Sequence, residues 1–468
     1  YSNTDVFSKS NIQADAEQNC FFTQTTTGNW NDSNNWSNNV IPTLNDNAAI
    51  NNGITSTVTQ NQAVSNLTLY NNSQVDINNG FSINVTGDIT NNSQVTGEGE
   101  VILNGSANQE LRGNGIYENL KLDNSSGATV TGLTDITGVL SISTDNGTLT
   151  TNDNITMKCS FVNEPNQNAP KTTAQIGNIA SGAGITGEVT VERCVPKSNR
   201  AFRYISSPVN TTGSINANLQ EGATSASQDP KPGFGTHITG STTGSNGFDA
   251  TQTGNPSMFE WNESLATPAW EAITSTNQTG DKMNIGDAYA LMIRGSRATP
   301  LNSNTAVGPA TTLRFTGTLV TGDKPVAGTN LSGNNGEYNL IANPYQAIVD
   351  TKSLLQGSDA TDLNTNFIYV YDPTLGSQGG YATIDISEAD PTSTPEDGNI
   401  TGSTNADENI LPNQAFFVET TGTSPSLTFK ETYKNVTAGL VDTFSATNVL
   451  SEMHINLRRQ PADVLVDG

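Results

Sequence analysis

Between residues 28 and 195 the chain carries short runs in which apolar and polar side chains alternate. Alternation with a period of two predicts strands that bury one face. Asn-Gly pairs separate several runs, and this dipeptide enters the left-handed backbone region at low steric cost. The pattern therefore predicts many short strands joined by tight turns. The runs include 66–69, 74–77, 81–85, 101–103, 119–122, 139–142 and 155–157.

Two architectures fit these runs: an antiparallel sandwich and a parallel β-solenoid. The units share a drifting similarity, each of them being a strand, a turn and a strand. Repeats of this kind bury a core only by stacking on one another, so each needs few apolar side chains. Asparagine can add ladders along such a stack. We therefore predict an all-β chain with an N-terminal parallel β-solenoid (β-helix) over residues 22–196.

Two tryptophans precede the repeats, Trp30 and Trp36, and Pro42 follows them. We expect this segment to cover the apolar interior of the first repeat. The alternative is a pair of exposed rings on which a sugar stacks.

The composition changes near residue 196, because most aromatic residues lie after it. Aromatic strands joined by long Gly/Ser/Thr loops are typical of a β-sandwich, which we expect over residues 197–430. The low-complexity stretch 213–247 is expected to be an exposed loop. Residues 1–21 read as an extended segment, either a linker or a strand that joins another subunit's sheet. Residues 431–468 read as the start of a further β unit or as a linker.

Composition and charge exclude several classes of protein. Only 33% of residues are hydrophobic, but only 14% are charged, whereas disordered chains usually combine low hydrophobicity with many charges. The net charge of -25 argues against a nucleic-acid partner and against an anionic membrane surface. No apolar run approaches the roughly 20 residues that a membrane-spanning helix needs.

The three cysteines are Cys20, Cys159 and Cys194. The last two each end a strand-like run, so they are the candidate disulfide if their strands lie on neighbouring turns. The alternative is two buried free thiols.

The order of several motifs resembles large surface proteins of Bacteroidetes (flavobacteria) that the type IX secretion system exports. The resemblance covers most of residues 28–430, and its last two motifs are specific only in combination. The motifs are 28–30 (GNW) with Trp36 and Pro42, 187–193 (GEVTVER), 200–209 (RAFRYISSPV), 258–261 (MFEW), 286–289 (GDAY), 339–345 (NLIANPY) and 411–418 (LPNQAFFV).

This resemblance implies a signal peptide already removed and a C-terminal sorting domain beyond residue 468. A chain that begins at Tyr1 without a hydrophobic leader fits a mature chain or an excerpt. The implied partners are the type IX secretion machinery and a cell-surface anchor, with an extracellular or surface location. The resemblance offers no catalytic residues to transfer.

Candidate chemistry is sparse. The chain has two histidines, His237 and His454, so a histidine metal cluster or a Ser-His-Asp triad would need one of them. No nucleophile elbow, phosphate loop or zinc-protease motif occurs. Oxygen ligands at Asp390, Glu396 and Asp397 could form a Ca²⁺ site, although their spacing matches no known calcium loop and a solvated acidic loop is the simpler interpretation. We expect no other cofactor and no catalytic residues.

The leading hypothesis is a secreted, non-catalytic structural or adhesive surface protein, in which a stiff solenoid holds a sandwich away from the cell. One alternative is a carbohydrate-binding or polysaccharide-degrading protein that uses the solenoid groove. The other is a subunit of an extracellular filament, in which neighbouring copies join through residues 1–21 or the C-terminus. Glycans and copies of the chain itself are therefore the candidate ligands.

Overall fold

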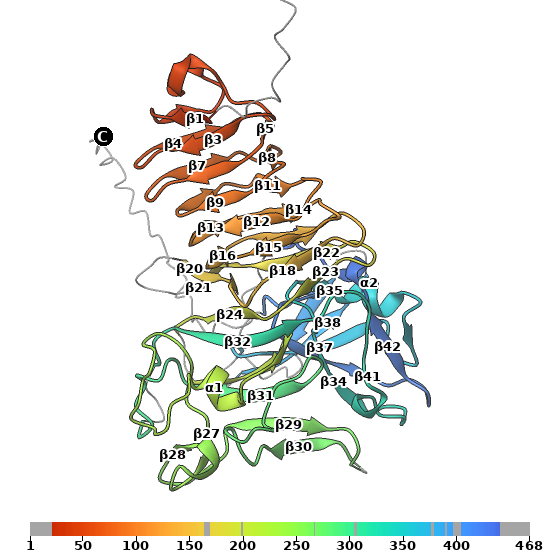
Figure 1. Cartoon of the computed structure of the whole chain (residues 1–468). Coiled ribbons are helices and arrows are strands. Elements are labelled where there is room, and N and C mark those ends of the chain that lie inside the picture. Colours follow the sequence, from red (N-terminus) through yellow and green to blue (C-terminus); the bar gives the residue numbers. More distant parts are fainter. Residues whose placement is uncertain are drawn as a thin grey trace, which may run out of the picture.

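The computed structural model describes residues 21–162, 169–197, 200–265, 267–303, 307–375, 379–388, 391–395 and 404–439. The chain first forms a column of stacked strands and then a broader region of antiparallel sheets at the far end of that column (Figure 1). The fold class predicted from the sequence, a parallel β-solenoid followed by antiparallel sheets, is confirmed.

Each complete solenoid turn contributes one strand to each of three sheets, the first and last turns contribute strands to the first two sheets only, and neighbouring turns pair in parallel. The first sheet holds β1 (Phe21–Gln24), β3 (Asn47–Ile50), β6 (Leu67–Leu69), β9 (Ile89–Asn91), β12 (Gln109–Arg112), β15 (Ala128–Val130), β18 (Thr148–Thr150) and β23 (Gly184–Thr186). The second holds β2 (Gly28–Asn29), β4 (Thr55–Val58), β7 (Gln74–Ile77), β10 (Gln94–Thr96), β13 (Gly115–Tyr117), β16 (Thr134–Ile136), β19 (Ile155–Met157) and β24 (Val189–Val195). The third holds β5 (Gln62–Val64), β8 (Ser82–Val85), β11 (Glu100–Leu103), β14 (Leu120–Leu122), β17 (Val139–Ile142) and β22 (Gln175–Ile179).

The alternating pattern places one apolar column inside each sheet. In the third sheet Val85 pairs with Leu103, and Leu103 pairs with Leu122, all three being buried. The polar positions between them face outwards, where amide side chains link successive turns. Asn104 donates to the Oδ1 of Asn84 at 3.1 Å, and Asn66 donates to that of Asn47 at 2.6 Å. These contacts confirm the asparagine ladders expected from the composition.

A short segment with two 3₁₀ turns, η2 (Ser33–Asn35) and η3 (Ser37–Asn39), closes the first turn. Trp30 and Trp36 are 0% and 2% exposed, and their ring centroids lie 4.8 Å apart in an edge-to-face arrangement. The indole nitrogen of Trp36 donates to the carbonyl of Trp30 at 2.7 Å. The pair is therefore a cap for the solenoid core, and the alternative of exposed sugar-stacking rings is wrong.

A hairpin interrupts the last complete turn. It consists of β20 (Cys159–Val162) and β21 (Ala169–Thr173). Cys159 is disulfide-bonded to Cys194 in β24, with the two Cα atoms 5.7 Å apart. The candidate disulfide predicted from the sequence is thus present, and it fastens the hairpin to the final strand of the second sheet.

The solenoid and the following region share one sheet. Strand β24 pairs antiparallel with β32 (Thr311–Leu319), which pairs on its other edge with β26 (Val209–Thr211). Buried side chains from both regions, including Val191 and Phe315, belong to one continuous core. The predicted boundary at residue 196 directly follows β24, and the sheet that contains β24 continues into the second region.

Two antiparallel sheets dominate the second region. One contains β25 (Ala201–Ser206), β31 (Ala288–Ile293), β29 (Met258–Asn262) and β30 (Ala269–Ala272), and we call it the hairpin sheet. The other contains β34 (Tyr338–Ala342), β41 (Ala415–Glu419), β37 (Phe367–Asp372), β38 (Gly380–Asp385) and β39 (Thr392–Pro395), and we call it the outer sheet.

Smaller elements complete this region. They are β27 (Thr239–Ser241) with β28 (Asp249–Ala250), β33 (Lys324–Pro325) with β42 (Ser426–Phe429) and β36 (Ala360–Thr361), β35 (Val349–Asp350) with β40 (Asn409–Ile410), the helices α1 (Ile215–Leu219) and α2 (Thr351–Gln356), and the 3₁₀ turns η4 (Ser245–Gly247), η5 (Gly328–Asn330) and η6 (Glu431–Tyr433).

The segment after the outer sheet returns to the solenoid. Lys434 forms an ion pair of 2.6 Å with Glu431 and donates to the carbonyl of Gly177 near the end of the third solenoid sheet. Glu431 accepts from the backbone N–H of Ile179 at 3.1 Å. Residues 431–439 thus pack against the solenoid. Of the predicted extended segment 1–21, only Phe21 is described, at the start of β1.

The expectation of an exposed loop at 213–247 is only partly right, because 222–233 and 241–247 are mostly exposed, whereas α1 and residues 235–239 are largely buried. Helix α1 packs against β32, and Ile215, Leu219 and Ile238 are buried in the main core. A buried polar cluster, described below, explains why a segment so poor in apolar residues packs inside. Among the described helices, none is long and apolar enough to span a membrane.

Candidate functional site

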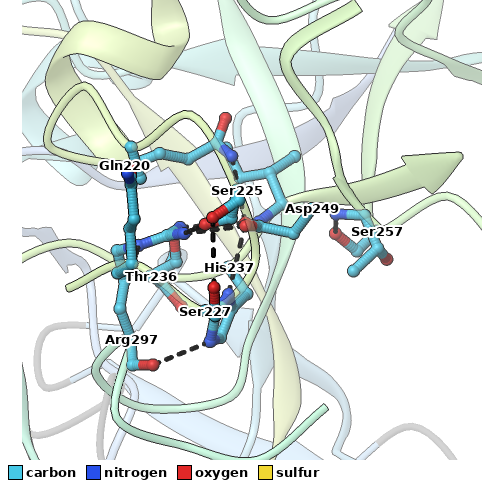
Figure 2. Close-up of polar contacts among 12 residues, drawn as sticks. Gln220, Ser225, Ser227, Thr236, His237, Asp249, Ser257 and Arg297 are labelled. Carbon is cyan, nitrogen blue, oxygen red and sulfur yellow. Dashed lines mark hydrogen bonds and ion pairs between the residues drawn. The ribbon is translucent and has the colours of Figure 1, made fainter. Parts of the chain in front are cut away.

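His237 lies in a buried polar cluster with Asp249 and Arg297 (Figure 2). Its Nδ1 lies 3.2 Å from Asp249 Oδ2, an arrangement that resembles two members of a catalytic triad. However, its Nε2 contacts the carbonyl oxygen of Arg297 at 2.9 Å, where a triad would place a nucleophile. The histidine is 1% exposed, so no substrate reaches it. The cluster is therefore structural.

Arg297 is the centre of this cluster. Its two terminal nitrogens contact the two carboxylate oxygens of Asp249 at 2.7 and 2.9 Å, which is a bidentate pair. The remaining donors reach the carbonyls of Ser225, Gln228 and Thr236, all in the 213–247 segment. Burial alone would raise the pKa of Asp249, but the hydrogen bonds from His237 and Arg297 and the guanidinium charge hold that pKa well below its usual range.

A cluster of aromatic side chains, several of them only partly buried, lies between the hairpin sheet and the outer sheet. The two sheets turn aromatic faces towards each other, because Phe259 and Trp261 alternate with polar residues on β29, and Tyr369 and Tyr371 alternate with buried aliphatic residues on β37. Phe417 is buried between them. The rings at the margin stay partly exposed, so the sheets meet without closing over this cluster.

Two hollows follow this margin, and together we call them the aromatic groove. One has a volume of about 220 Å³ and is lined by Trp261, Tyr338, Tyr369, Tyr381 and Phe417. The other has a volume of about 260 Å³ and is lined by Phe202, Tyr204, Phe259, Trp270, Ala290 and Tyr371.

The rings of the groove hold one another in place. Trp261 and Trp270 are cross-strand partners on the hairpin β29–β30, with ring centroids 5.1 Å apart. Trp261 also contacts Phe417 edge-to-face at 5.1 Å, and its indole nitrogen donates to the carbonyl of Tyr338 at 3.0 Å. Tyr204 packs on Trp270 at 5.1 Å. The tryptophans are thus preorganised, which lowers the entropic cost of binding a flat ligand.

An acidic hollow of about 180 Å³ adjoins the groove at Trp261, which lines both. Its walls include the carboxylates of Glu260, Glu263 and Asp287. Asp287 accepts hydrogen bonds from the backbone and side-chain nitrogens of Asn284 at 3.0 and 3.1 Å. Both hollows of the groove therefore offer aromatic faces, and the carboxylates of the acidic hollow adjoin the hollow that Trp261 lines.

Burial and neighbouring charge change the acidity of two of these groups. Burial raises the pKa of Glu263 to about 7, against the effect of hydrogen bonds from the backbone of Glu263 and Leu340. Partial burial also raises the pKa of Glu260, as do the nearby carboxylates of Asp287, Glu271 and Asp281. The carboxylates around Glu260 thus repel one another, whereas burial favours the neutral form of Glu263.

The calcium candidates Asp390, Glu396 and Asp397 lie outside the described residues. Within the described part of the chain, no group of three or more His, Cys, Asp or Glu side chains converges on a position for a metal ion. This includes the three carboxylates of the acidic hollow.

The solenoid offers a different kind of surface. An open hollow of about 350 Å³ follows the corner between its first two sheets and is lined by Asn51, Asn52, Tyr70, Asn71 and Asn92. Tyr70 is the one aromatic ring in it and is 43% exposed.

Sequence reasoning placed the aromatic residues in the predicted β-sandwich without distinguishing those of its core from those of its surface. Phe416 and Tyr345 are indeed buried, yet Trp261, Trp270 and Tyr381 are only partly so. The composition of β29 and β30 could have indicated partly exposed rings, because a hairpin at the edge of a sheet does not need two paired tryptophans for its packing. Glu260, Glu263 and Asp287 were not candidates, because nothing in their spacing brings them together.

No protein-family model, curated protein or solved structure matches this chain.

Proposed function

We propose that the protein is an extracellular, non-catalytic adhesive protein that binds glycans in the aromatic groove, while the solenoid serves as a stiff support. The observation that carries this proposal is the line of partly exposed, mutually fixed rings around Trp261 and Trp270. The apolar faces of sugar rings stack on such platforms, and nearby carboxylates and carbonyls accept hydrogen bonds from hydroxyl groups.

The disulfide supports an extracellular location, since such bonds persist in oxidising compartments. Export by the type IX system and attachment to the cell surface are part of the proposal and are supported by the motif resemblance alone. The chain's acidity fits a soluble surface protein that does not bind nucleic acid.

A polysaccharide-cleaving enzyme is the second candidate, because Glu263 is a carboxyl group with a raised pKa in a hollow beside an aromatic wall. Perturbed carboxyl groups of this kind occur at active sites and also in structural clusters. Incubation of the protein with the glycans that it binds, followed by chromatography of soluble products, distinguishes the two. We expect binding without product release, and turnover that is lost in Glu263→Gln would contradict the non-catalytic assignment.

The experiment that tests the proposal is a glycan screen of the intact chain and of two matched variants. Trp270→Ala removes a groove ring, whereas Tyr70→Ala removes an exposed ring from the solenoid. We expect at least one polysaccharide to bind the wild type and Tyr70→Ala but not Trp270→Ala. Absence of binding to every glycan would overturn the proposal, as would binding that survives Trp270→Ala and is lost in Tyr70→Ala.

A further inference from the structure

We propose that the occupant of the aromatic groove is a glycan whose sugar rings carry protonated amines, such as a polymer of glucosamine. This inference rests on the proposed glycan binding and names the ligand class. It follows from charge complementarity between an apolar, ring-lined surface and the carboxylates that adjoin it.

The carboxylates beside the groove have no cationic partner among the ion pairs of the described residues. Glu260, Glu263 and Asp287 belong to none of these pairs. Lys324 lines a neighbouring hollow that shares Asp287 with the acidic hollow, but it does not line the acidic hollow itself. The side facing Trp261 is therefore purely acidic.

The pairing register adds to this crowding. Glu260 lies directly opposite Glu271 in the β29–β30 hairpin, one step from the Trp261–Trp270 pair. Like charges opposite each other on neighbouring strands destabilise a hairpin. Because successive side chains of a strand point to opposite faces, the Glu260–Glu271 pair lies on the other face of the hairpin from the Trp261–Trp270 pair, and it adds to the negative charge of the acidic hollow rather than to that of the groove.

The arrangement of these carboxylates favours a polymeric cation over a single ion. In the described residues they do not converge on one metal position. They instead line a hollow that shares the wall residue Trp261 with the groove. A chain of amino sugars matches this layout, because one sugar can stack on the indole while the amine of its neighbour reaches the acidic hollow. An ammonium group against an aromatic face gains a further cation–π attraction.

The test compares three β-1,4-linked hexasaccharides that differ only at carbon 2: hexaglucosamine, its fully N-acetylated form and cellohexaose. Binding of each to the intact protein is measured by isothermal titration calorimetry at neutral pH and low salt, because in acid the buried carboxyl of Glu263, whose pKa is raised to about 7, becomes neutral. We expect hexaglucosamine to bind at least tenfold more tightly than the other two, and added NaCl to reduce that advantage. Equal affinity for the three would overturn the inference while leaving glycan binding intact.

Two variants separate this inference from the proposed function. In Glu260→Gln/Glu263→Gln/Asp287→Asn we expect affinity for hexaglucosamine to fall to the level of cellohexaose, with cellohexaose binding unchanged. In Trp270→Ala we expect all three affinities to fall together. Retention of the hexaglucosamine preference in the triple variant would overturn the role of the carboxylates. Absence of binding by all three sugars to the wild type would overturn the inference, and the wider glycan screen then decides whether the proposed function fails as well.

Discussion

The solenoid and the region that follows it use large side chains in opposite ways. In the solenoid Trp30 and Trp36 are fully buried, and the exterior is built of short polar side chains that link one turn to the next. In the second region Trp261 and Trp270 remain partly exposed along an open groove. The solenoid needs its aromatic residues for closure, whereas the antiparallel sheets leave theirs available for a ligand.

The two regions also differ in how polar groups support the fold. Solenoid turns are joined by many small amide contacts, each of modest energy. The 213–247 segment instead depends on one buried charge cluster around Arg297 and Asp249. A single substitution should therefore have a local effect in the solenoid, unless it affects the tryptophan cap. In the second region a single substitution in the charge cluster should have a far-reaching effect.

The largest effect is expected from the cap. Trp30→Ala removes a fully buried ring that covers the first solenoid turn, and large aromatic truncations cost about 3–5 kcal/mol. We expect the free energy of unfolding to fall by that amount in urea denaturation followed by circular dichroism. The exposed control Tyr70→Ala should change it by less than about 0.5 kcal/mol. Equal stability of the two variants would show that the first turn is not closed by the tryptophans.

Asp249→Asn should be nearly as damaging in the second region. It leaves the guanidinium of Arg297 buried without its carboxylate, and breaking a buried pair typically costs about 3–5 kcal/mol. The same denaturation measurement applies, with limited proteolysis to show release of the 213–247 segment. Asp145→Asn, at an exposed solenoid position, is the control and should be neutral. An unaltered proteolysis pattern in Asp249→Asn would mean that the cluster does not anchor the segment.

The pH dependence of stability tests the contribution of Asp249 to the buried cluster in a second way. The pKa of Asp249 is lower in the folded protein than in the unfolded chain, so its contribution is complete above the ordinary carboxyl pKa of about 4 and is lost as the pH falls below that value. We therefore expect the stability difference between the wild type and Asp249→Asn to be constant near neutrality and to shrink in acid. A difference that grows in acid would contradict the assigned direction of the pKa.

Loss of the disulfide should have a smaller effect that spans both regions. Cys159 and Cys194 are separated by 35 residues, and a cross-link of that length is worth about 2–4 kcal/mol. We expect the Cys159→Ser/Cys194→Ser double variant to unfold at lower urea concentration by that amount while it still binds glycans. Loss of glycan binding at unchanged stability would link the hairpin β20–β21 to the groove, which the structure does not predict.

The sequence predicted the solenoid well because each turn has its own local alternation of apolar and polar residues. Alternation such as that around Ile83 and Val85 determines which side chains face inwards, and the stacking of successive turns then buries them. The cap and the disulfide were also within reach, since Trp30, Trp36 and the two cysteines lie at the ends of recognisable runs. In these places local pattern and tertiary packing agree.

The second region was predicted only as antiparallel β-structure. The ion pair of Arg297 with Asp249 joins positions 48 residues apart, and no periodicity signals such a contact. For that reason the buried parts of the 213–247 segment, α1 and residues 235–239, were wrongly expected to be exposed. The aromatic groove escaped prediction for a related reason: whether a ring such as Trp270 is core or surface depends on how two sheets approach, which the sequence of either strand does not contain.

The central claim is that the groove binds ligand and the solenoid supports it. The most direct measurement is the ratio of dissociation constants of Trp270→Ala and wild type for the polysaccharide selected by the glycan screen, with Tyr70→Ala as the matched solenoid control. Removal of a key binding tryptophan typically costs about 2 kcal/mol, or roughly thirtyfold in Kd, while the loss of ring contacts should lower fold stability by only about 1–2 kcal/mol. We predict a roughly thirtyfold ratio for Trp270→Ala and a ratio of one for Tyr70→Ala; the reverse result would contradict the account.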